Sequence, residues 1–265
     1  MKKGVKPYYI YVFLFLTLLF ICISCVKIKE GFSEKIDERR VKAKIPLHIY
    51  QTWYTKQLPL KMQECVDTLK QLNPEFEHEL FDDADCANFI KTNYDQDVYD
   101  AYNALIPGAY KADLWRYCIL YKKGGIYLDI KFCNINGFKF IDLIDKDYYV
   151  RDLARSGGGI YNALIISKPH NPKLLKCIKK IVENVQHKFY GRSSLEPTGP
   201  LLLKNMFSQD ELDNLELSLD GNEYNGTIIY KNNGILKMYT EYRREQENTN
   251  KPRYHSLWRT RNIYK

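Results

Sequence analysis

The sequence has few of the residues that break regular structure, with 14 glycines and 10 prolines among 265 residues. It shows no internal repeat and no low-complexity block. This shortage excludes collagen-like chains and Pro/Gly-rich disordered chains. Apolar residues make up 45% of the chain and charged residues 27%, as in ordinary globular proteins. The length suits one substantial domain with a large core, or at most two small ones.

Cysteines at metal-binding spacing are missing from the folded part of the sequence. Of the seven cysteines, Cys22 and Cys25 form a C-x-x-C pair inside an apolar segment, where packing or palmitoylation fits better than metal chemistry. The other five are scattered, so we expect no zinc cluster, and the sequence leaves disulfide pairing open. Residues 157–159 are three glycines, but no Gly-Lys-Ser/Thr follows them, which excludes a P-loop.

The folded part also lacks an excess of positive charge. The net charge is +8, and residues 1–44 hold ten Lys/Arg against four Asp/Glu, so they contribute +6 and the other 221 residues only +2. A nucleic-acid-binding face needs basic residues clustered on the folded domain. We therefore expect no nucleic-acid partner.

One long apolar run is present near the N-terminus. Residues 8–26 contain no charge over 19 positions and have lysines on both sides. About 20 apolar residues span a bilayer as a helix, and no small-x-small cleavage site follows. The sequence therefore predicts a short basic tail (1–7), a transmembrane signal anchor (8–26), a polar stalk (27–44) and a folded domain (45–265).

The short N-terminal flank favours a single-pass type II orientation, with the domain translocated. The compartment stays open between a Golgi-type membrane in a eukaryote, a bacterial envelope and a virus-associated membrane. Two alternatives for the apolar run remain: a buried core helix, and a bacterial lipoprotein signal that ends at Cys25.

Periodicity predicts alternating strands and helices after residue 45. Strands are expected at residues 46–52, 76–81, 126–128 and 162–167, and helices at 62–72, 83–94, 109–122 and 173–186. Such alternation is typical of an α/β fold with a mostly parallel central sheet.

The segment ADLWRYCILYKKGGIYLDIKF, residues 112–132, concentrates charged residues around a strand. A helix carries Asp113 and Arg116 at i, i+3, hence on one face. A Gly-Gly turn and a short buried strand then lead to Asp129 at the carboxyl end of that strand. In open α/β sheets ligands bind beyond the carboxyl ends of strands, where a carboxylate can hold a cation and the phosphates it bridges.

This segment resembles the sugar-binding region of DXD-containing glycosyltransferases, the family of initiating α-mannosyltransferases and capsular polysaccharide transferases, distantly related to the clostridial glucosylating toxins. The matching positions are Ala112-Asp113, Arg116-Tyr117, Leu120-Tyr121, Gly124-Gly125, Tyr127 and Asp129. Further matches lie outside the segment, at Ile45-Pro46, Gln51-Thr52-Trp53, Asn73-Pro74, Asp82-Asp83, Asn162-Ala163, Thr198-Gly199-Pro200 and His255-Ser256-x-Trp258. The resemblance spans about residues 45–260 and implies a GT-A-like fold that binds a nucleotide-diphosphate sugar.

The second carboxylate of the D-x-D motif is absent, because Asp129-Ile130-Lys131 stands in its place. On a strand, residues i and i+2 point to the same side, so this chain would present a carboxylate and a cation. Two readings follow. A divalent cation is still held by Asp129, His255 and the donor phosphates, which we favour, or Lys131 itself neutralises the diphosphate.

The resemblance implies a hexosyltransferase that moves a hexose from a UDP- or GDP-sugar to a hydroxyl of a glycan, lipid or protein, with retention and with Mn²⁺ or Mg²⁺ assistance. The residues implied are Asp129, Asp113 and Arg116 for catalysis; Trp53, Asp113, Arg116, Tyr117, Gly125 and Lys131 for donor binding; and Asp129 and His255 for the metal. Without the resemblance, Asp113 and Arg116 would be an ordinary helix-surface pair, Trp53 a core aromatic and His255 a solvated histidine.

Two other functional classes stay open. One is a glycosyltransferase-like module that lost catalysis with its second carboxylate and binds glycans or nucleotide-sugars. The other is a membrane tether whose domain acts as a scaffold. Nucleotide-sugar hydrolysis would identify the enzyme, and a lack of nucleotide-diphosphate binding would favour the tether.

Overall fold

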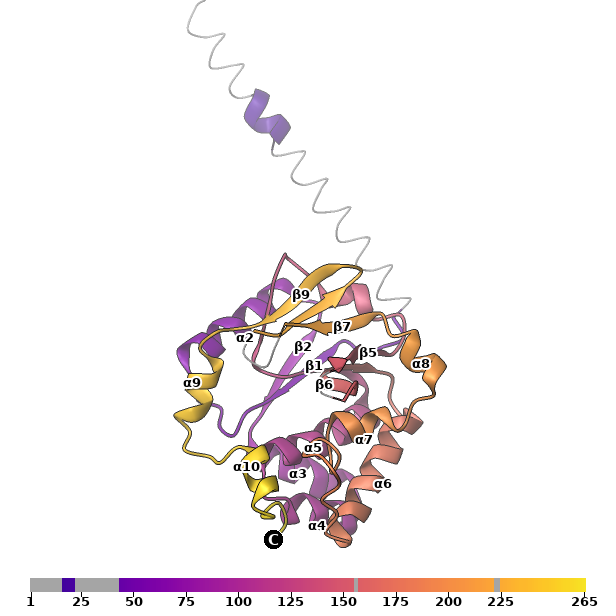
Figure 1. Cartoon of the computed structure of the whole chain (residues 1–265). Coiled ribbons are helices and arrows are strands. Elements are labelled where there is room, and N and C mark those ends of the chain that lie inside the picture. The colour runs from indigo at the N-terminus through magenta and orange to yellow at the C-terminus, as the bar shows by residue number, and fades with distance from the viewer. Residues whose placement is uncertain (1–15, 22–42, 155–156, 222–224) are drawn as a thin grey trace, which may run out of the picture. The chain divides into compact units, whose positions relative to one another are not determined.

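In the computed structural model, a nine-stranded sheet forms the centre of the folded domain (Figure 1). In spatial order its strands are β2 (Glu77–Phe81), β1 (His48–Thr52), β3 (Gly125–Leu128), β6 (Ile160–Ser167), β5 (Tyr148–Arg151), β7 (Leu217–Asp220), β8 (Thr227–Tyr230), β9 (Asn233–Met238) and β4 (Phe132–Asn134). The four strands expected from the sequence are β1, β2, β3 and β6.

The sheet is mixed, so the α/β prediction is confirmed but the expectation of a mostly parallel sheet is wrong. The pairs β1–β2, β1–β3 and β5–β7 are parallel, whereas β3–β6, β5–β6, β7–β8, β8–β9 and β4–β9 are antiparallel. For β5–β6, β7–β8 and β8–β9 the physical reason is the short connection between the two strands, which leaves no room for a crossover helix. Between β8 and β9 only Lys231 and Asn232 intervene, with φ of 48° and 64°, the conformation of a tight hairpin turn.

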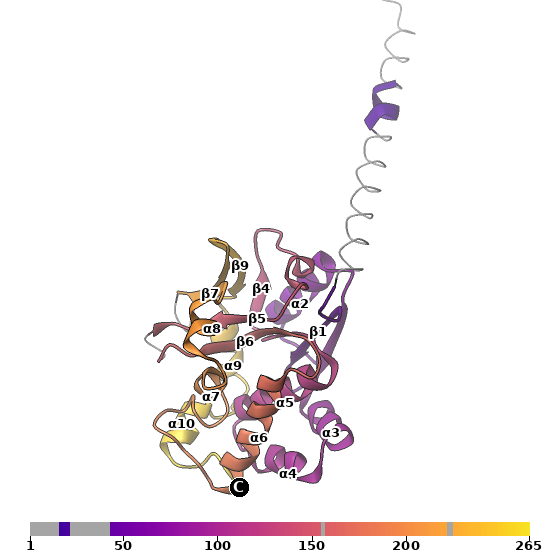
Figure 2. The ribbon, with the colours of Figure 1, turned by 90° about the vertical axis from the view of Figure 1, so that its right-hand side faces the viewer.

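Helices cover the sheet and connect its strands. They are α2 (Leu60–Leu72), α3 (Asp83–Asn93), α4 (Gln96–Ala104), α5 (Gly108–Lys123), α6 (Pro172–Gln186), α7 (Pro200–Lys204), α8 (Gln209–Asp213), α9 (Tyr242–Glu247) and α10 (Tyr254–Arg259), with a 3₁₀ turn at Phe140–Leu143. Two views at right angles show α3, α4, α5 and α6 gathered on one side of the sheet (Figures 1 and 2).

Helix α5 lies at the centre of this layer and packs on β3, β6, α3, α4 and α6. It is buried on most sides, and its Leu114, Trp115 and Cys118 are fully buried. Such a helix is stable only inside a protein core. Its carboxyl end leads directly into β3, so the helix and strand that carry the candidate site form one continuous buried unit.

The Gly124-Gly125 turn between α5 and β3 requires glycine at both positions. Their φ values are 66° and 104°. A Cβ on Gly124 would lie 2.6 Å from Pro169, and a Cβ on Gly125 would lie 2.8 Å from the carbonyl oxygen of His48. Only glycine combines this backbone conformation with such close neighbours. The turn therefore fixes the entry of the chain into β3.

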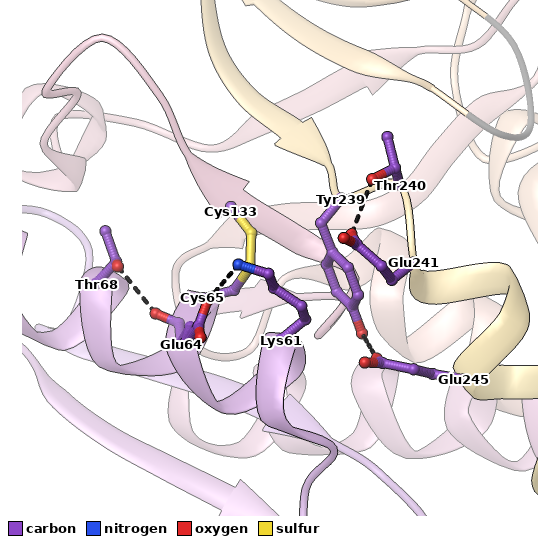
Figure 3. Close-up of a disulfide and its surroundings, with 9 residues drawn as sticks. All are labelled: Lys61, Glu64, Cys65, Thr68, Cys133, Tyr239, Thr240, Glu241 and Glu245. Carbon is purple, nitrogen blue, oxygen red and sulfur yellow. Dashed lines mark hydrogen bonds and ion pairs between the residues drawn. A yellow bond between two sulfur atoms is a disulfide. The ribbon is translucent and has the colours of Figure 1, made fainter.

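A disulfide joins Cys65 of α2 to Cys133 of β4 (Figure 3). Their Cα atoms are 4.8 Å apart, within the ordinary range for a disulfide. Among the described residues, the remaining cysteines are Cys86, Cys118 and Cys177, all buried and free. The disulfide attaches the short strand β4 to the helix that covers it.

The structure describes residues 16–21, 43–154, 157–221 and 225–265. Residues 44–265 form one unit and the segment up to residue 43 forms another. Residues 16–21 are helical, but the rest of the predicted membrane segment 8–26 and nearly all of the predicted stalk 27–44 lie outside the described residues. In the described part of the chain, no helix combines the length and apolar character needed to cross a bilayer.

Candidate functional site

A tight turn between β3 and β4 carries the D-x-K sequence. The backbone N–H of Asp129 donates to Ala163 of β6 at 2.7 Å, and the N–H of Phe132 donates to the Asp129 carbonyl at 3.2 Å. The sequence pattern implied that Asp129 and Lys131 lie on one strand. In the structure they lie on a turn instead. Their side chains nevertheless meet, as the pattern predicted, and they lie beyond the carboxyl end of β3.

Arg116 connects the carboxylates of Asp113 and Asp129. Its Nη2 lies 3.2 Å from Asp113 Oδ1 and its Nη1 lies 3.2 Å from Asp129 Oδ1. Nη1 also donates to the carbonyl oxygen of Asn162 at 2.6 Å, and the guanidinium lies over the ring of Tyr127, 4.3 Å from its centre. Arg116 is only 5% exposed. The predicted helix-borne pair thus faces the interior beneath the turn, where a charge must be paired.

Asp113 is fully hydrogen-bonded on both oxygens. Asn162 Nδ2 donates to Oδ1 at 2.9 Å and Thr198 Oγ1 donates to Oδ2 at 2.7 Å. The same Asn162 amide donates to the hydroxyl of Tyr117 at 3.1 Å. Burial raises the pKa of Asp113 above its ordinary value, and the charge of Arg116 and these hydrogen bonds act against the rise.

Asp129 and Lys131 form a close ion pair. Lys131 Nζ donates to Asp129 Oδ2 at 2.5 Å, while Oδ1 accepts from the Tyr127 hydroxyl at 2.6 Å as well as from Arg116. Burial alone would raise the pKa of Asp129, but Lys131 and Arg116 outweigh burial and hold it below the ordinary value. The turn therefore presents an ionised carboxylate whose two oxygens are already engaged by two cations and a hydroxyl.

These residues do not fit a divalent cation. An ion at Asp129 would have to displace Lys131 or stand beside its ammonium, and charges of +2 and +1 at 4 Å repel by about 8 kcal/mol at an effective dielectric constant of about 20. His255, the second predicted ligand, is exposed on α10, and its Nδ1 lies 3.3 Å from Ser194 Oγ. Asp129 and His255 were predicted to share a metal ion, but no contact between them is found among the described residues.

One group of possible metal ligands does exist in the described part of the chain. The ligand atoms of His48, Glu77 and Glu79 lie within 4.8 Å of one another. His48 begins β1 and lies beside Gly125 at the start of β3. Because β1 and β3 are parallel, this group lies at the opposite end of the strands from Asp129. It is separate from the D-x-K turn.

The structure places the other predicted donor-binding residues in different surroundings. Trp53 directly follows β1, is half-buried, and packs on Tyr54 and Tyr242 with ring centres 5.2 and 6.2 Å away. Burial raises the pKa of Tyr242, and the charge of nearby Lys131 opposes the rise. Gly125 lies at the far end of β3. The donor-binding roles of these residues stay predictions.

Several residues of the network were not selected from the sequence. Asn162 and Thr198 fix Asp113, and Tyr127 contacts both Arg116 and Asp129. The signal was present, since Asn162-Ala163 and Thr198-Gly199-Pro200 belong to the quoted family pattern. Tyr242 carried no such signal.

Comparison with known proteins confirms the resemblance. Residues 59–146 match the family described as "Glycosyltransferase sugar-binding region containing DXD motif". The matched region includes α5, β3 and the D-x-K turn.

The curated relatives include fungal enzymes. Inositol phosphoceramide mannosyltransferase 3 of Schizosaccharomyces pombe is 32% identical over 192 residues, or 69% of this chain and 50% of that protein. The initiation-specific alpha-1,6-mannosyltransferase of Candida albicans is 35% identical over 91 residues, or 32% of this chain and 24% of that protein. This chain thus matches half or less of the length of each. Among solved structures, the PaToxG glycosyltransferase superposes with a TM-score of 0.49 at 18% identity, covering 71% of this chain and 77% of that one.

Proposed function

We propose that the chain is a hexosyltransferase that uses a nucleotide-diphosphate sugar as donor and a hydroxyl group as acceptor. The observation that carries the proposal is the bridge of Arg116 between Asp113 and Asp129, inside the region that matches the sugar-binding family. Carboxylates and a guanidinium offer the acceptors and donors that sugar hydroxyls need. Their burial and mutual pairing hold these groups in a fixed geometry, as a catalytic site requires.

The accessible part of the site is its outer edge. The side chains of Asp129 and Lys131 are 19% and 16% exposed, against 10% for Asp113 and 6% for Arg116. A donor would therefore meet the turn directly, with Asp113 and Arg116 beneath it. Tyr117, deeper still and 0% exposed, would support the pocket through Asn162.

The relatives' names support a hexose donor, mannose first among them, and a glycan or lipid acceptor. Attachment to a membrane through residues 8–26, in a type II orientation, would place the domain beside a lipid-linked acceptor. The disulfide between Cys65 and Cys133 supports an oxidising compartment for the domain, because such bonds are rare in reducing ones. Transfer would proceed with retention of the anomeric configuration, as the family resemblance implies.

The test is turnover of donor sugars by the full chain purified in detergent. GDP- and UDP-hexoses are offered one at a time, and release of the nucleoside diphosphate is measured with and without a phosphoinositol-containing lipid or an oligosaccharide acceptor. We expect one donor to be turned over by the wild type, with unchanged turnover in Arg259→Ala, a change at an exposed arginine of α10. No release from any donor, with no thermal shift on donor addition, would refute the proposal.

A catalytically inactive binding module is the second candidate, and one observation favours it. Lys131 replaces the second carboxylate, as expected for a site that has lost metal-assisted catalysis. Saturable binding of a nucleotide-sugar without release of its diphosphate would establish this alternative.

A further inference from the structure

The pairing of Lys131 with Asp129 bears on how the departing diphosphate is stabilised. We infer that the ammonium group of Lys131 takes the place of the divalent cation, so that donor binding and transfer at this site need no metal. The inference rests on the proposed function and deepens it, since it states which group receives the leaving phosphates.

The first support is the way Asp129 is occupied. A metal needs lone pairs of the carboxylate, and here Oδ2 holds Lys131 at 2.5 Å while Oδ1 accepts from Tyr127 and Arg116. The cations that hold this carboxylate are part of the chain itself. A divalent ion would have to remove Lys131 from a pocket in which its side chain is only 16% exposed.

The second support is the charge of the turn. A D-x-D pair with one divalent cation has a net charge of zero, and so has Asp129 with Lys131. Arg116 and Asp113 add one positive and one negative charge beneath it, which leaves the four-residue cluster neutral. Replacing one carboxylate by an ammonium thus reproduces the local charge of the metal-loaded site without the ion.

The third support is the number of donors on Lys131. Its ammonium has three N–H groups: Asp129 accepts one and the hydroxyl of Tyr161 is a second partner, which leaves one. The rings of Phe132 and Tyr161 lie 5.6 and 5.2 Å from Nζ and shield it from part of the solvent. A partly buried ammonium with a remaining donor suits a phosphate oxygen, because charge-assisted hydrogen bonds are stronger where water is excluded.

The chemical step balances without a further reactant. The bond between the anomeric carbon and the phosphate oxygen breaks, and its electron pair stays on that oxygen, beside Lys131. The acceptor hydroxyl oxygen forms the new bond to the anomeric carbon, and its proton goes to water. Asp129 acts as a positioning residue that keeps Lys131 at the leaving group.

The experiment measures binding of GDP and UDP to the full chain by calorimetry, in excess EDTA and in Mn²⁺. The wild type should bind the preferred nucleotide with the same affinity, within threefold, in both conditions. Lys131→Met should weaken that binding at least tenfold in EDTA and leave binding of the uncharged nucleoside unchanged. Lys131→Arg should retain binding in EDTA, and Lys122→Met, at an exposed lysine of α5, should match the wild type.

Lys131→Asp restores the paired carboxylates and should make nucleotide binding depend on Mn²⁺. The wild-type comparison needs no variant, so it decides the inference even if a substitution prevents folding. Wild-type binding that disappears in EDTA and returns with Mn²⁺ would overturn the inference and leave the proposed function intact. Binding of neither nucleotide in either condition would overturn both.

Discussion

The hydroxyl of Thr198 donates a hydrogen bond to Asp113 Oδ2 at 2.7 Å, across 85 residues of sequence. Thr198 is 1% exposed and precedes α7, whereas Asp113 lies on α5. A loop of the second half of the chain therefore satisfies a carboxylate of the first. Without this donor, one oxygen of a buried and ionisable group would lose its partner.

Thr198→Val should destabilise the protein by about 2 kcal/mol, because it removes a hydrogen bond to a buried carboxylate. Thr198→Ser keeps the hydroxyl and should cost markedly less. Urea unfolding of the two variants and the wild type measures the difference. Equal losses in the two variants would show that the methyl group, and not the hydroxyl, matters at this position.

Arg116→Ala should destabilise the fold by about 3–5 kcal/mol, since it leaves the carboxylates of Asp113 and Asp129 buried without their shared cation. An exposed helix pair would lose only a few tenths of a kcal/mol. Thermal unfolding, with the exposed Arg259→Ala as control, provides the measurement. A variant that unfolds within 1 kcal/mol of the wild type would show that the bridge contributes little.

His78 should make stability fall in mildly acidic solution. Burial, helped by the charge of Lys70, lowers the pKa of His78 to about 4, and its ring pairs with buried Gln51 at 2.8 Å. The unfolded chain takes up the proton near pH 6.5 and the folded one only near pH 4, so this contribution is present above pH 6.5 and is lost as the pH falls toward 4.

The loss at His78 should approach about 3 kcal/mol over that window. Urea unfolding at pH 7, 5.5 and 4.5 checks it, with His78→Gln as the variant that keeps a polar partner for Gln51 but does not titrate. The variant should lose less stability than the wild type on acidification. If the free energy of unfolding falls equally with pH in the wild type and in His78→Gln, His78 is not the group responsible.

Removing the disulfide with Cys65→Ala and Cys133→Ala together should cost about 4 kcal/mol, the loop-closure value for a separation of 68 residues. The wild type should lose stability in dithiothreitol, and the double variant should not respond to it. A wild type that is insensitive to reductant, with no mass change on alkylation after reduction, would exclude the bond.

A variant that lacks residues 1–43 should fold with the stability of the full chain, because residues 44–265 form a unit of their own. It should also fail to float with lipid vesicles, whereas the full chain should float, if residues 8–26 are the membrane anchor. Flotation of both proteins would show that the folded domain itself binds the membrane.

Sequence periodicity predicted the elements around the site well because each has its own signal. Helix α5 and β3 are bounded by the Gly-Gly turn, and α6 has the apolar spacing of a half-buried helix. The strands β4, β5, β7, β8 and β9 were missed. All of them except β9 are only three or four residues long, too short for a clear alternation of apolar and polar residues. Strand direction was also mispredicted, since only the pairing partner reveals it.

The candidate site was predictable in its composition but not in its contacts. The residues Asp113, Arg116, Asp129 and Lys131 were selected from the sequence, and the structure brings these four together. The sequence could not reveal that Lys131 donates to Asp129 Oδ2, an oxygen that a metal ion would need. That contact depends on the conformation of the turn between β3 and β4. Nor could the sequence place His255, whose position depends on the packing of α10.

The position of β4 has a mechanical consequence. Only residues 129–131 separate β3 from β4, a reach of at most about 14 Å between the strand ends. Across the sheet, however, β3 and β4 are six strand spacings apart, or about 29 Å if the sheet were flat. The sheet must therefore curl until β4, its last strand, lies near β3, and the D-x-K turn is the covalent link that holds the two strands together. Any force that flattens the outer strands would stretch this turn. Deformation of the whole sheet would therefore change the distance between Asp129 and Lys131.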